Sequence, residues 1–96
     1  MYQSFSNAVA VAEISVVIPL CNEEGNVRPL YEELVGVLEG LGRSWEICFV
    51  DDGSRDETWE RLLTVTAGDP RVKLVRFATN FGQTTALAAG IHATAG

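Results

Sequence analysis

Three short apolar runs constrain the fold of this chain more than any other feature of its sequence. They cover residues 14–18, 46–50 and 72–77, and β-branched and aromatic side chains are frequent in them. The first run ends before Pro19 and does not alternate between apolar and polar residues. Such runs are typical of strands in a parallel sheet that is covered on both faces. The three runs are therefore predicted to be strands of one sheet.

A helical pattern separates the first two runs. From Val27 to Leu41, apolar residues recur at steps of three and four, and glutamates lie between them. This periodicity predicts an amphipathic helix. Asn26 is the predicted N-cap, and Gly40 and Gly42 are predicted to end the helix.

Helical patterns also follow the second and third runs. Ser54 and Glu57 have the spacing of a capping box, which predicts a second helix that ends at Gly68. Asn80 is predicted to open a third helix rich in small residues. Strands and helices thus alternate, and this order requires parallel strands joined by crossover helices. The predicted fold class is α/β, parallel and doubly wound (Rossmann-like).

Size and composition limit what such a fold can do here. The 96 residues form one small domain at most, with residues 1–13 predicted as a flexible leader. Seven Lys and Arg against thirteen Asp and Glu give a net charge of −6, which would repel a nucleic acid. Cys21 and Cys48 are too few for a disulfide framework and lack zinc-site spacing, so reduced thiols are expected. No apolar run approaches the roughly 20 residues that cross a bilayer.

The loops at the carboxyl ends of the strands are where a parallel sheet binds its ligands. The first loop reads Pro-Leu-Cys-Asn-Glu-Glu-Gly-Asn and contains neither the Gly-x-Gly-x-x-Gly turn nor the Gly-Lys-Ser motif that cradles phosphates. It offers carboxylates, which accept hydrogen bonds from ribose hydroxyls and from the imino N–H of uracil or guanine. Glu23 and Asp52 are the candidates for those two roles.

Simpler interpretations of the same residues stay open. The segment 51–54 also fits a plain turn before a capped helix, and Glu23 with Glu24 also fits solvated charge near a helix amino terminus. His92 has no second metal-type residue one turn away, so no function is assigned to it.

Three motifs taken together resemble the family 2 glycosyltransferases. They are Val-Val-Ile-Pro-Leu-Cys-Asn-Glu-Glu-Gly-Asn-Val, Glu-Ile-Cys-Phe-Val-Asp-Asp-Gly-Ser-Arg-Asp-Glu-Thr and Asn-Phe-Gly-Gln-Thr-Thr-Ala-Leu-Ala-Ala-Gly. The chain is most similar to the branch that transfers sugars to polyprenyl phosphates, which includes dolichol-phosphate mannose synthase. The resemblance runs from about Ile14 to Gly96.

The resemblance implies a GT-A fold, with residues 14–96 as the amino-terminal half that binds a nucleoside diphosphate sugar, UDP- or GDP-linked. Pro19, Cys21 and Glu23 would line the nucleoside pocket after the first strand. Val50 and Asp52 would hold the base after the second. The implied supporting positions, of which Asp51 and Ser54 would shape the turn, are Asn22, Asp51, Ser54, Asn80 and Gly82.

The chain departs from the family pattern at two positions. Cys21 stands where the family usually has a Tyr beside the base, so ring stacking is lost there. Thr79 stands where an Arg often precedes the third motif, which removes a positive charge near the phosphates. Both departures bear on fine specificity.

The resemblance also implies what lies beyond residue 96. Family members continue into an Asp-x-Asp motif that holds a divalent cation, Mg²⁺ or Mn²⁺, and then into the acceptor site and the catalytic base. We therefore expect this chain, as a truncated half, to carry no catalytic residue, to hold no cation and to lack transferase activity. The parent would transfer the sugar to dolichyl or undecaprenyl phosphate, by metal-assisted inverting displacement at the cytoplasmic face of the membrane, in cell envelope biosynthesis.

The family's strand order, 3-2-1-4, implies an open edge on the first strand in this chain, because the fourth strand is missing from it. An open apolar edge invites pairing with another chain, which predicts a homo-oligomer.

Two other classes of function are alternatives to this one. A phosphoacceptor receiver domain is also doubly wound, but it carries its acid pair after the first strand, whereas here the pair follows the second. A non-catalytic interaction module is the remaining alternative.

Overall fold

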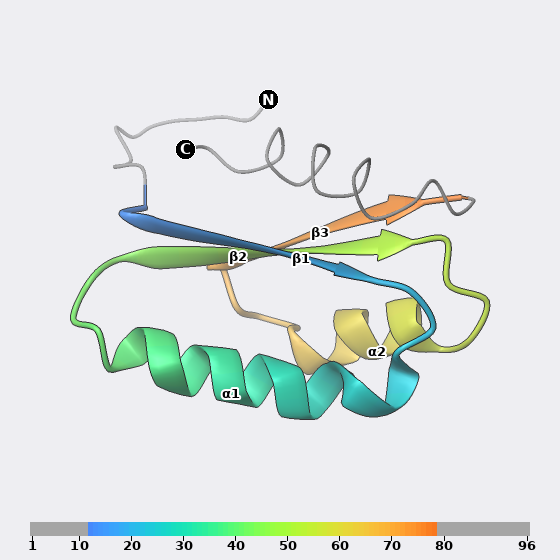
Figure 1. Ribbon diagram of the computed structural model, residues 1–96, viewed down its shortest axis with the longest axis horizontal. Coiled ribbons are helices and arrows are strands. Elements are labelled where there is room, and N and C mark those ends of the chain that lie inside the picture. Colours follow the sequence, from blue (N-terminus) through green and yellow to red (C-terminus); the bar gives the residue numbers. More distant parts are fainter. Residues whose placement is uncertain (1–11, 79–96) are drawn as a thin grey trace.

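Three parallel strands and two α-helices make up the described part of the chain, residues 12–78 of a computed structural model. The sheet order is β1-β2-β3, and both pairings are parallel (Figure 1). The predicted α/β class with a parallel, Rossmann-like sheet is confirmed. In chain order the elements are β1 (Ile14–Leu20), the 3₁₀ turn η1 (Glu24–Asn26), α1 (Val27–Glu39), β2 (Trp45–Asp52), α2 (Thr58–Val65) and β3 (Val72–Phe77).

Both helices lie on the same face of the sheet (Figure 1). The chain moves in one direction from β1 to β2 to β3, and two right-handed crossovers in one direction place both helices on one side. The third helix, predicted from Asn80, lies outside the described residues. Neither of the two described helices is long and apolar enough to cross a bilayer.

β2 is the central strand, and all eight of its residues are buried. Its odd-numbered side chains face the helices, where Ile47 and Phe49 pack in one cluster with Leu62 of α2. The even-numbered Cys48 and Val50 are buried on the opposite face. Full burial of a large apolar side chain contributes roughly 1.5–3 kcal/mol, so β2 anchors the core from both faces.

β1 is longer than predicted, because it includes Pro19 and Leu20 instead of ending at Ile18. The Ile14 N–H donates to the Ser44 carbonyl, so the even-numbered residues of β1 direct their backbone groups toward β2 and the odd-numbered ones outward. The missing N–H of Pro19 therefore falls on the outer edge. It costs the sheet no hydrogen bond, which is why the strand continues through a proline.

The predicted turn begins later than expected, and the predicted capping box is wrong. Asp51 and Asp52 are the last residues of β2, and the bend follows at Gly53, held by the Asp51 side chain. α2 begins at Thr58, and its N-cap position makes no side-chain capping bond, so Ser54 and Glu57 do not form a capping box. The second helix also ends before Gly68, at Val65.

Two expectations near the helix and strand starts also need correction. Asn26 occupies the N-cap position of α1 but makes no side-chain capping bond; its amide donates to Glu23 Oε1 instead. Glu13, assigned to the leader, exchanges two hydrogen bonds with Ser44, of 2.9 Å and 3.1 Å. Glu13 therefore belongs to the folded part.

Asp69, in the turn before β3, ties that turn to α1. Its carboxylate accepts the Tyr31 hydroxyl over 2.6 Å and is held by Arg71, whose Nε lies 3.0 Å from Oδ1 and whose Nη2 lies 3.2 Å from Oδ2. Arg71 also binds Glu39 over 3.2 Å and stacks on Trp45, with Cζ 3.9 Å from the ring centroid. The hydrogen bonds from Arg71, and then from Tyr31, hold the pKa of Asp69 at about 2.

We expect Asp69→Asn to lower the free energy of unfolding at pH 7 by about 1–2 kcal/mol, because charge-assisted hydrogen bonds are lost. Since the folded-state pKa of Asp69 is depressed, its contribution is present above the unfolded-state pKa of about 4 and is lost as the pH falls toward 2. Urea unfolding at pH 7, 4 and 2.5 should therefore show a smaller acid-induced loss in the variant. Glu32→Gln, which removes an exposed partner of Arg28, is the control. Identical acid-induced losses in wild type and Asp69→Asn would contradict this account.

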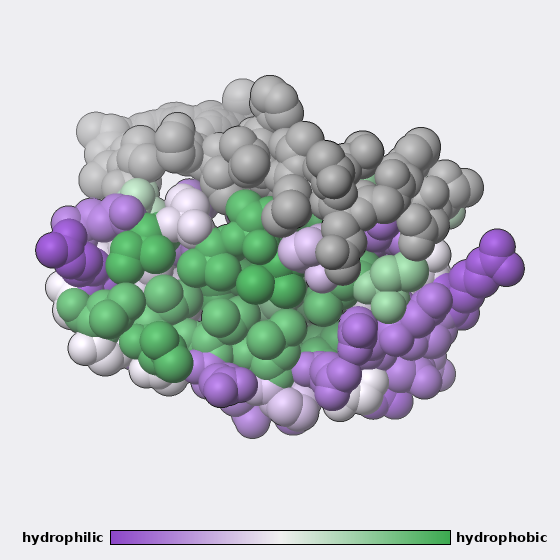
Figure 2. Space-filling view, viewed as in Figure 1, coloured by the Kyte–Doolittle hydropathy of each residue, from purple (hydrophilic) through white to green (hydrophobic). Residues whose placement is uncertain are grey.

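The outer edge of β1 is open within residues 12–78, because β2 is the only strand that pairs with it there. Ile14, Val16 and Ile18 are only partly buried. Val37 and Leu41, at the end of α1 and just beyond it, are 60% and 52% exposed. On the side of the molecule that Figure 2 shows, a continuous apolar area lies in the centre and is bordered by hydrophilic residues at both ends and along the lower edge.

The predicted self-association through this edge can be tested with one backbone change. Val17 is odd-numbered, so Val17→Pro removes an outward N–H and leaves the ladder to β2 intact. In sizing chromatography with light scattering at micromolar concentration, we expect wild type to form dimers or larger species and Val17→Pro to shift toward monomer. A monodisperse wild-type monomer would count against the prediction.

Candidate functional site

The loops that follow β1 and β2 lie side by side at the carboxyl edge of the sheet. The register pairs Leu20, the last residue of β1, with Asp51, so both strands end at the same level. This edge is where the sequence predicts ligand binding.

Asn22 joins the two loops through its backbone and its side chain. Its N–H donates to Ser54 Oγ over 2.9 Å, and its Oδ1 accepts the Arg55 N–H over 2.8 Å. Asn22 has a φ of 56°, a left-handed conformation that asparagine adopts more readily than most residues. The residue type at position 22 therefore suits both the bend and the contact.

Further hydrogen bonds join the first loop to the start of α2. The Glu23 N–H donates to Thr58 Oγ1 over 2.8 Å, and the Glu24 N–H donates to Asp56 Oδ2 over 3.2 Å. In return, Glu24 Oε1 accepts the Glu57 N–H over 3.0 Å. The two loops thus form one hydrogen-bonded unit.

Asp56 and Thr58 were missed by sequence reasoning, although they hold this unit together. The Asp56 carboxylate accepts hydrogen bonds from both the N–H and the hydroxyl of Thr58. These bonds lower the pKa of Asp56, and the bond from the hydroxyl has the larger effect. An Asp two residues before the N–H that it caps is a recognised turn signal. The Asp-x-Thr spacing could therefore have predicted the cap.

Asp51 and Ser54 define the turn after β2. The Ser54 N–H donates to Asp51 Oδ1 over 3.0 Å, and Asp51 is fully buried. Between them, Gly53 has a φ of 73°, where a side chain would be strained. This geometry is what a turn-shaping role for Asp51 and Ser54 requires.

Pro19, Val50 and Asp52 lie on the opposite face of the sheet from the helices. Pro19 pairs with Val50 in the register, and Asp52 follows Val50 by two residues, so the three share that face. Val50 is fully buried, and Asp52 is 2% exposed. The structure thus brings together three of the five residues predicted to contact a nucleoside.

The other two predicted contact residues belong to the loop after β1. Cys21, which forms no disulfide among the described residues, is of intermediate exposure. The carboxylate of Glu23, also of intermediate exposure, accepts the side-chain amide of Asn26 over 2.7 Å. A nucleoside that contacts both Glu23 and Asp52 would have to lie across the edge of the sheet. That these two residues bind one nucleoside stays a prediction. Asn80 and Gly82 lie outside the described residues.

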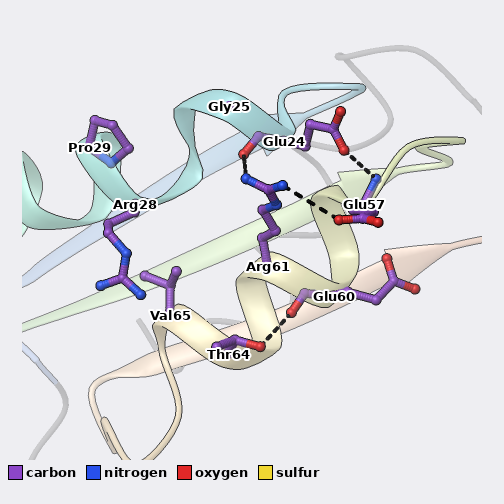
Figure 3. A pocket seen from close by; sticks show the side chains of 9 residues that line it. All are labelled: Glu24, Gly25, Arg28, Pro29, Glu57, Glu60, Arg61, Thr64 and Val65. Atoms are coloured by element: carbon purple, nitrogen blue, oxygen red, sulfur yellow. Dashed lines mark hydrogen bonds and ion pairs between the residues drawn. The ribbon is translucent and has the colours of Figure 1, made fainter.

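A groove of about 550 Å³ lies on the helix side of this loop unit, between the amino-terminal end of α1 and the length of α2 (Figure 3). Arg61 crosses it, with Nη1 3.5 Å from the Glu24 carbonyl and Nη2 3.5 Å from Glu57 Oε1. None of the residues predicted to bind a nucleoside lines it. The lining residues, two arginines among three glutamates with four uncharged residues, are Glu24, Gly25, Arg28, Pro29, Glu57, Glu60, Arg61, Thr64 and Val65.

Three carboxylates outnumber two guanidinium groups in the groove, which gives a diphosphate no net attraction. A metal centre is also missing from the part of the chain that is described, since no three His, Cys, Asp or Glu side chains gather there. Within residues 12–78, the candidate site is therefore the carboxyl edge of β1 and β2.

Comparison with known sequences gives a consistent family assignment. The sequence profile described as Glycosyl transferase family 2 matches residues 15–96. An undecaprenyl-phosphate 4-deoxy-4-formamido-L-arabinose transferase of Pectobacterium atrosepticum is 39% identical over 90% of this chain and 27% of its own length. A dodecaprenyl-phosphate galacturonate synthase of Rhizobium johnstonii is 35% identical over 95% of this chain and 27% of its own length. The chain spans about a quarter of the length of the curated relatives it matches.

A solved structure has a similar fold. It is the mannosyltransferase PcManGT from Pyrobaculum calidifontis in complex with GDP-Man and Mn²⁺, which superposes with a TM-score of 0.65. The sequence identity is 24%, and the match covers 88% of this chain and 25% of that one. At this sequence identity, the similarity supports the fold alone.

We expect Thr58→Val to lower the free energy of unfolding by about 1–3 kcal/mol, because it is nearly isosteric but leaves the Glu23 N–H without its acceptor. Thr64→Val is the matched control, since the exposed Thr64 hydroxyl bonds only to the Glu60 carbonyl of its own helix. Urea unfolding of both variants measures the difference. Equal effects of the two substitutions would mean that the contact between the loops contributes nothing.

Proposed function

The chain belongs to glycosyl transferase family 2, and we propose that it is the nucleotide-sugar-binding part of an inverting glycosyltransferase. The observation that carries the proposal is the grouping of Pro19, Val50 and Asp52 on one face at the carboxyl edge of the sheet. A carboxylate at that edge is a matched acceptor for the imino N–H of uracil or guanine. The bound donor is accordingly a UDP- or GDP-linked sugar.

The proposed acceptor is a polyprenyl phosphate. Two relatives are named for transfer to, or synthesis on, undecaprenyl and dodecaprenyl phosphate, and their sugars differ. This combination supports a lipid phosphate acceptor without indicating which sugar is moved. Because the acceptor is a membrane lipid, the proposed place of the parent protein is the cytoplasmic face of the membrane.

The proposed cation belongs to the parent protein and not to residues 12–78, where no suitable cluster of ligands gathers. Carboxylates alone repel a diphosphate, so the parent needs Mg²⁺ or Mn²⁺ to bind one tightly. In support, the similar mannosyltransferase was solved with GDP-Man and Mn²⁺. The residues of this chain would recognise the nucleoside, and the chain alone would transfer no sugar.

Nucleoside recognition by Asp52 can be tested by titrating uridine, guanosine, UDP and GDP, with and without Mg²⁺, into the labelled chain. Amide shifts in two-dimensional NMR should report weak binding of uracil or guanine nucleosides at residues 50–54. Cytidine is the ligand control, because cytosine lacks an imino N–H. Asp52→Asn should weaken binding about tenfold or more, as expected for a lost charge-assisted hydrogen bond.

Glu60→Gln is the matched protein control, because Glu60 is an exposed acid of the groove between the helices. We expect it to bind like wild type. The proposal fails if no nucleoside shifts the amides of residues 50–54, or if Asp52→Asn binds as well as Glu60→Gln. Turnover of a nucleotide sugar by this chain would overturn the expectation that it is inactive.

A further inference from the structure

We propose that Arg76 of β3 is a positioning residue for the two loops at the candidate site. It holds the buried Asp51 carboxylate where that carboxylate fixes Ser54 and, through Ser54, the backbone of Asn22. The expected effect of Arg76 on ligand binding rests on the proposed function. The expected effect of Arg76 on the two loops is independent of that function.

Asp51 is a buried carboxylate that accepts a hydrogen bond at only one of its two oxygens among the described residues. The side chain has no solvent exposure, and Oδ1 accepts the Ser54 N–H over 3.0 Å. Oδ2 is also buried, and it has no hydrogen-bond partner among the described residues. A carboxylate in this position needs a positive charge close by, because burial removes the water that would otherwise stabilise it.

Arg76 supplies that charge from the neighbouring strand. The register pairs Asp51 with Arg76, and Arg76 Nε lies 3.9 Å from Asp51 Oδ2. The guanidinium is also held from the helix side, with Cζ 5.3 Å from the ring centroid of Trp59. The Arg76 side chain is 46% exposed, so it keeps its own hydration while it faces the buried acid.

The turn that depends on Asp51 continues into the loop after β1. Ser54 donates its N–H to Asp51 and accepts the Asn22 N–H at its hydroxyl over 2.9 Å. Gly53 and Asn22 both have left-handed backbones, with φ of 73° and 56°, which the surrounding hydrogen bonds must hold.

The members of this chain of contacts are the sequence neighbours of the proposed ligand contacts. Asn22 lies between Cys21 and Glu23, and Asp51 directly precedes Asp52. A shift of the Asp51 carboxylate would therefore displace the proposed nucleoside contacts on both loops. Arg76 itself lies on β3 and needs to touch no ligand.

Amide hydrogen exchange measured by NMR tests the positioning role. In Arg76→Gln we expect the Ser54 and Asn22 amides to exchange about tenfold faster or more, while the Phe49 amide in the centre of β2 is little changed. Arg76→Lys, which keeps the charge, should restore most of the protection. Lys73→Gln is the control, because it removes a positive charge from the same strand that pairs with Glu46 and not with Asp51.

A double variant keeps the test decisive if Arg76→Gln alone folds poorly. Asn at position 51 can still accept the Ser54 N–H but carries no charge, so adding Asp51→Asn should suppress the effect of Arg76→Gln. Equal acceleration at Ser54, Asn22 and Phe49, no acceleration at all, or no suppression in the double variant would overturn the proposal.

Ligand titration separates this proposal from the proposed function. If wild type binds uridine or guanosine, Arg76→Gln should bind several-fold more weakly, Arg76→Lys should recover affinity, and Lys73→Gln should match wild type. Unchanged affinity in Arg76→Gln would overturn the link to binding. If wild type binds no nucleoside, the proposed function fails, while the exchange rates at Ser54 and Asn22 still decide whether Arg76 positions the loops.

Discussion

The complete burial of β2 is the constraint on which the rest of this structure depends. A strand that is buried on both faces and paired along both edges has one register with each neighbour, because a slip by one residue would replace Ile47 and Phe49 with the smaller Cys48 and Val50 in the cluster with the helices. That register brings the end of β1 level with Asp51 and the end of β3 level with Asp52. The carboxyl edge, and with it the candidate site, is therefore positioned by the packing of residues such as Ile47 and Phe49, far from any chemistry.

Two acidic residues in succession at the end of such a strand necessarily have different tasks. Asp51 faces the helices, where it is enclosed and binds the turn. Asp52 faces the other side of the sheet, beside Val50 and the register position of Pro19. The alternation of the strand thus places the carboxylate that shapes the turn and the Asp52 carboxylate on opposite faces of the sheet. Hydrogen bonds from the Asn22 and Glu23 N–H groups to Ser54 and Thr58 then join the first loop to the second.

Much of this could be predicted from the sequence, because apolar periodicity is a local signal. The three strands and two helices were found at their correct places, and Val72–Phe77 was predicted with its observed bounds. The errors fall where tertiary contacts decide. Pro19 stays in β1 because its missing N–H faces outward, and the Ser54 hydroxyl oxygen accepts the Asn22 N–H instead of capping α2. The contact of Arg76 with Asp51 depends on the register between β2 and β3, which no spacing along the chain reveals.

The central claim is that a nucleoside is recognised at the carboxyl edge of β1 and β2. The most direct measurement is a structure of the chain with bound uridine or guanosine. The account predicts an imino N–H within hydrogen-bonding distance of the Asp52 carboxylate, with the ribose toward residues 21–23. A nucleoside seated in the groove between α1 and α2, with the Asp52 carboxylate uninvolved, would contradict it.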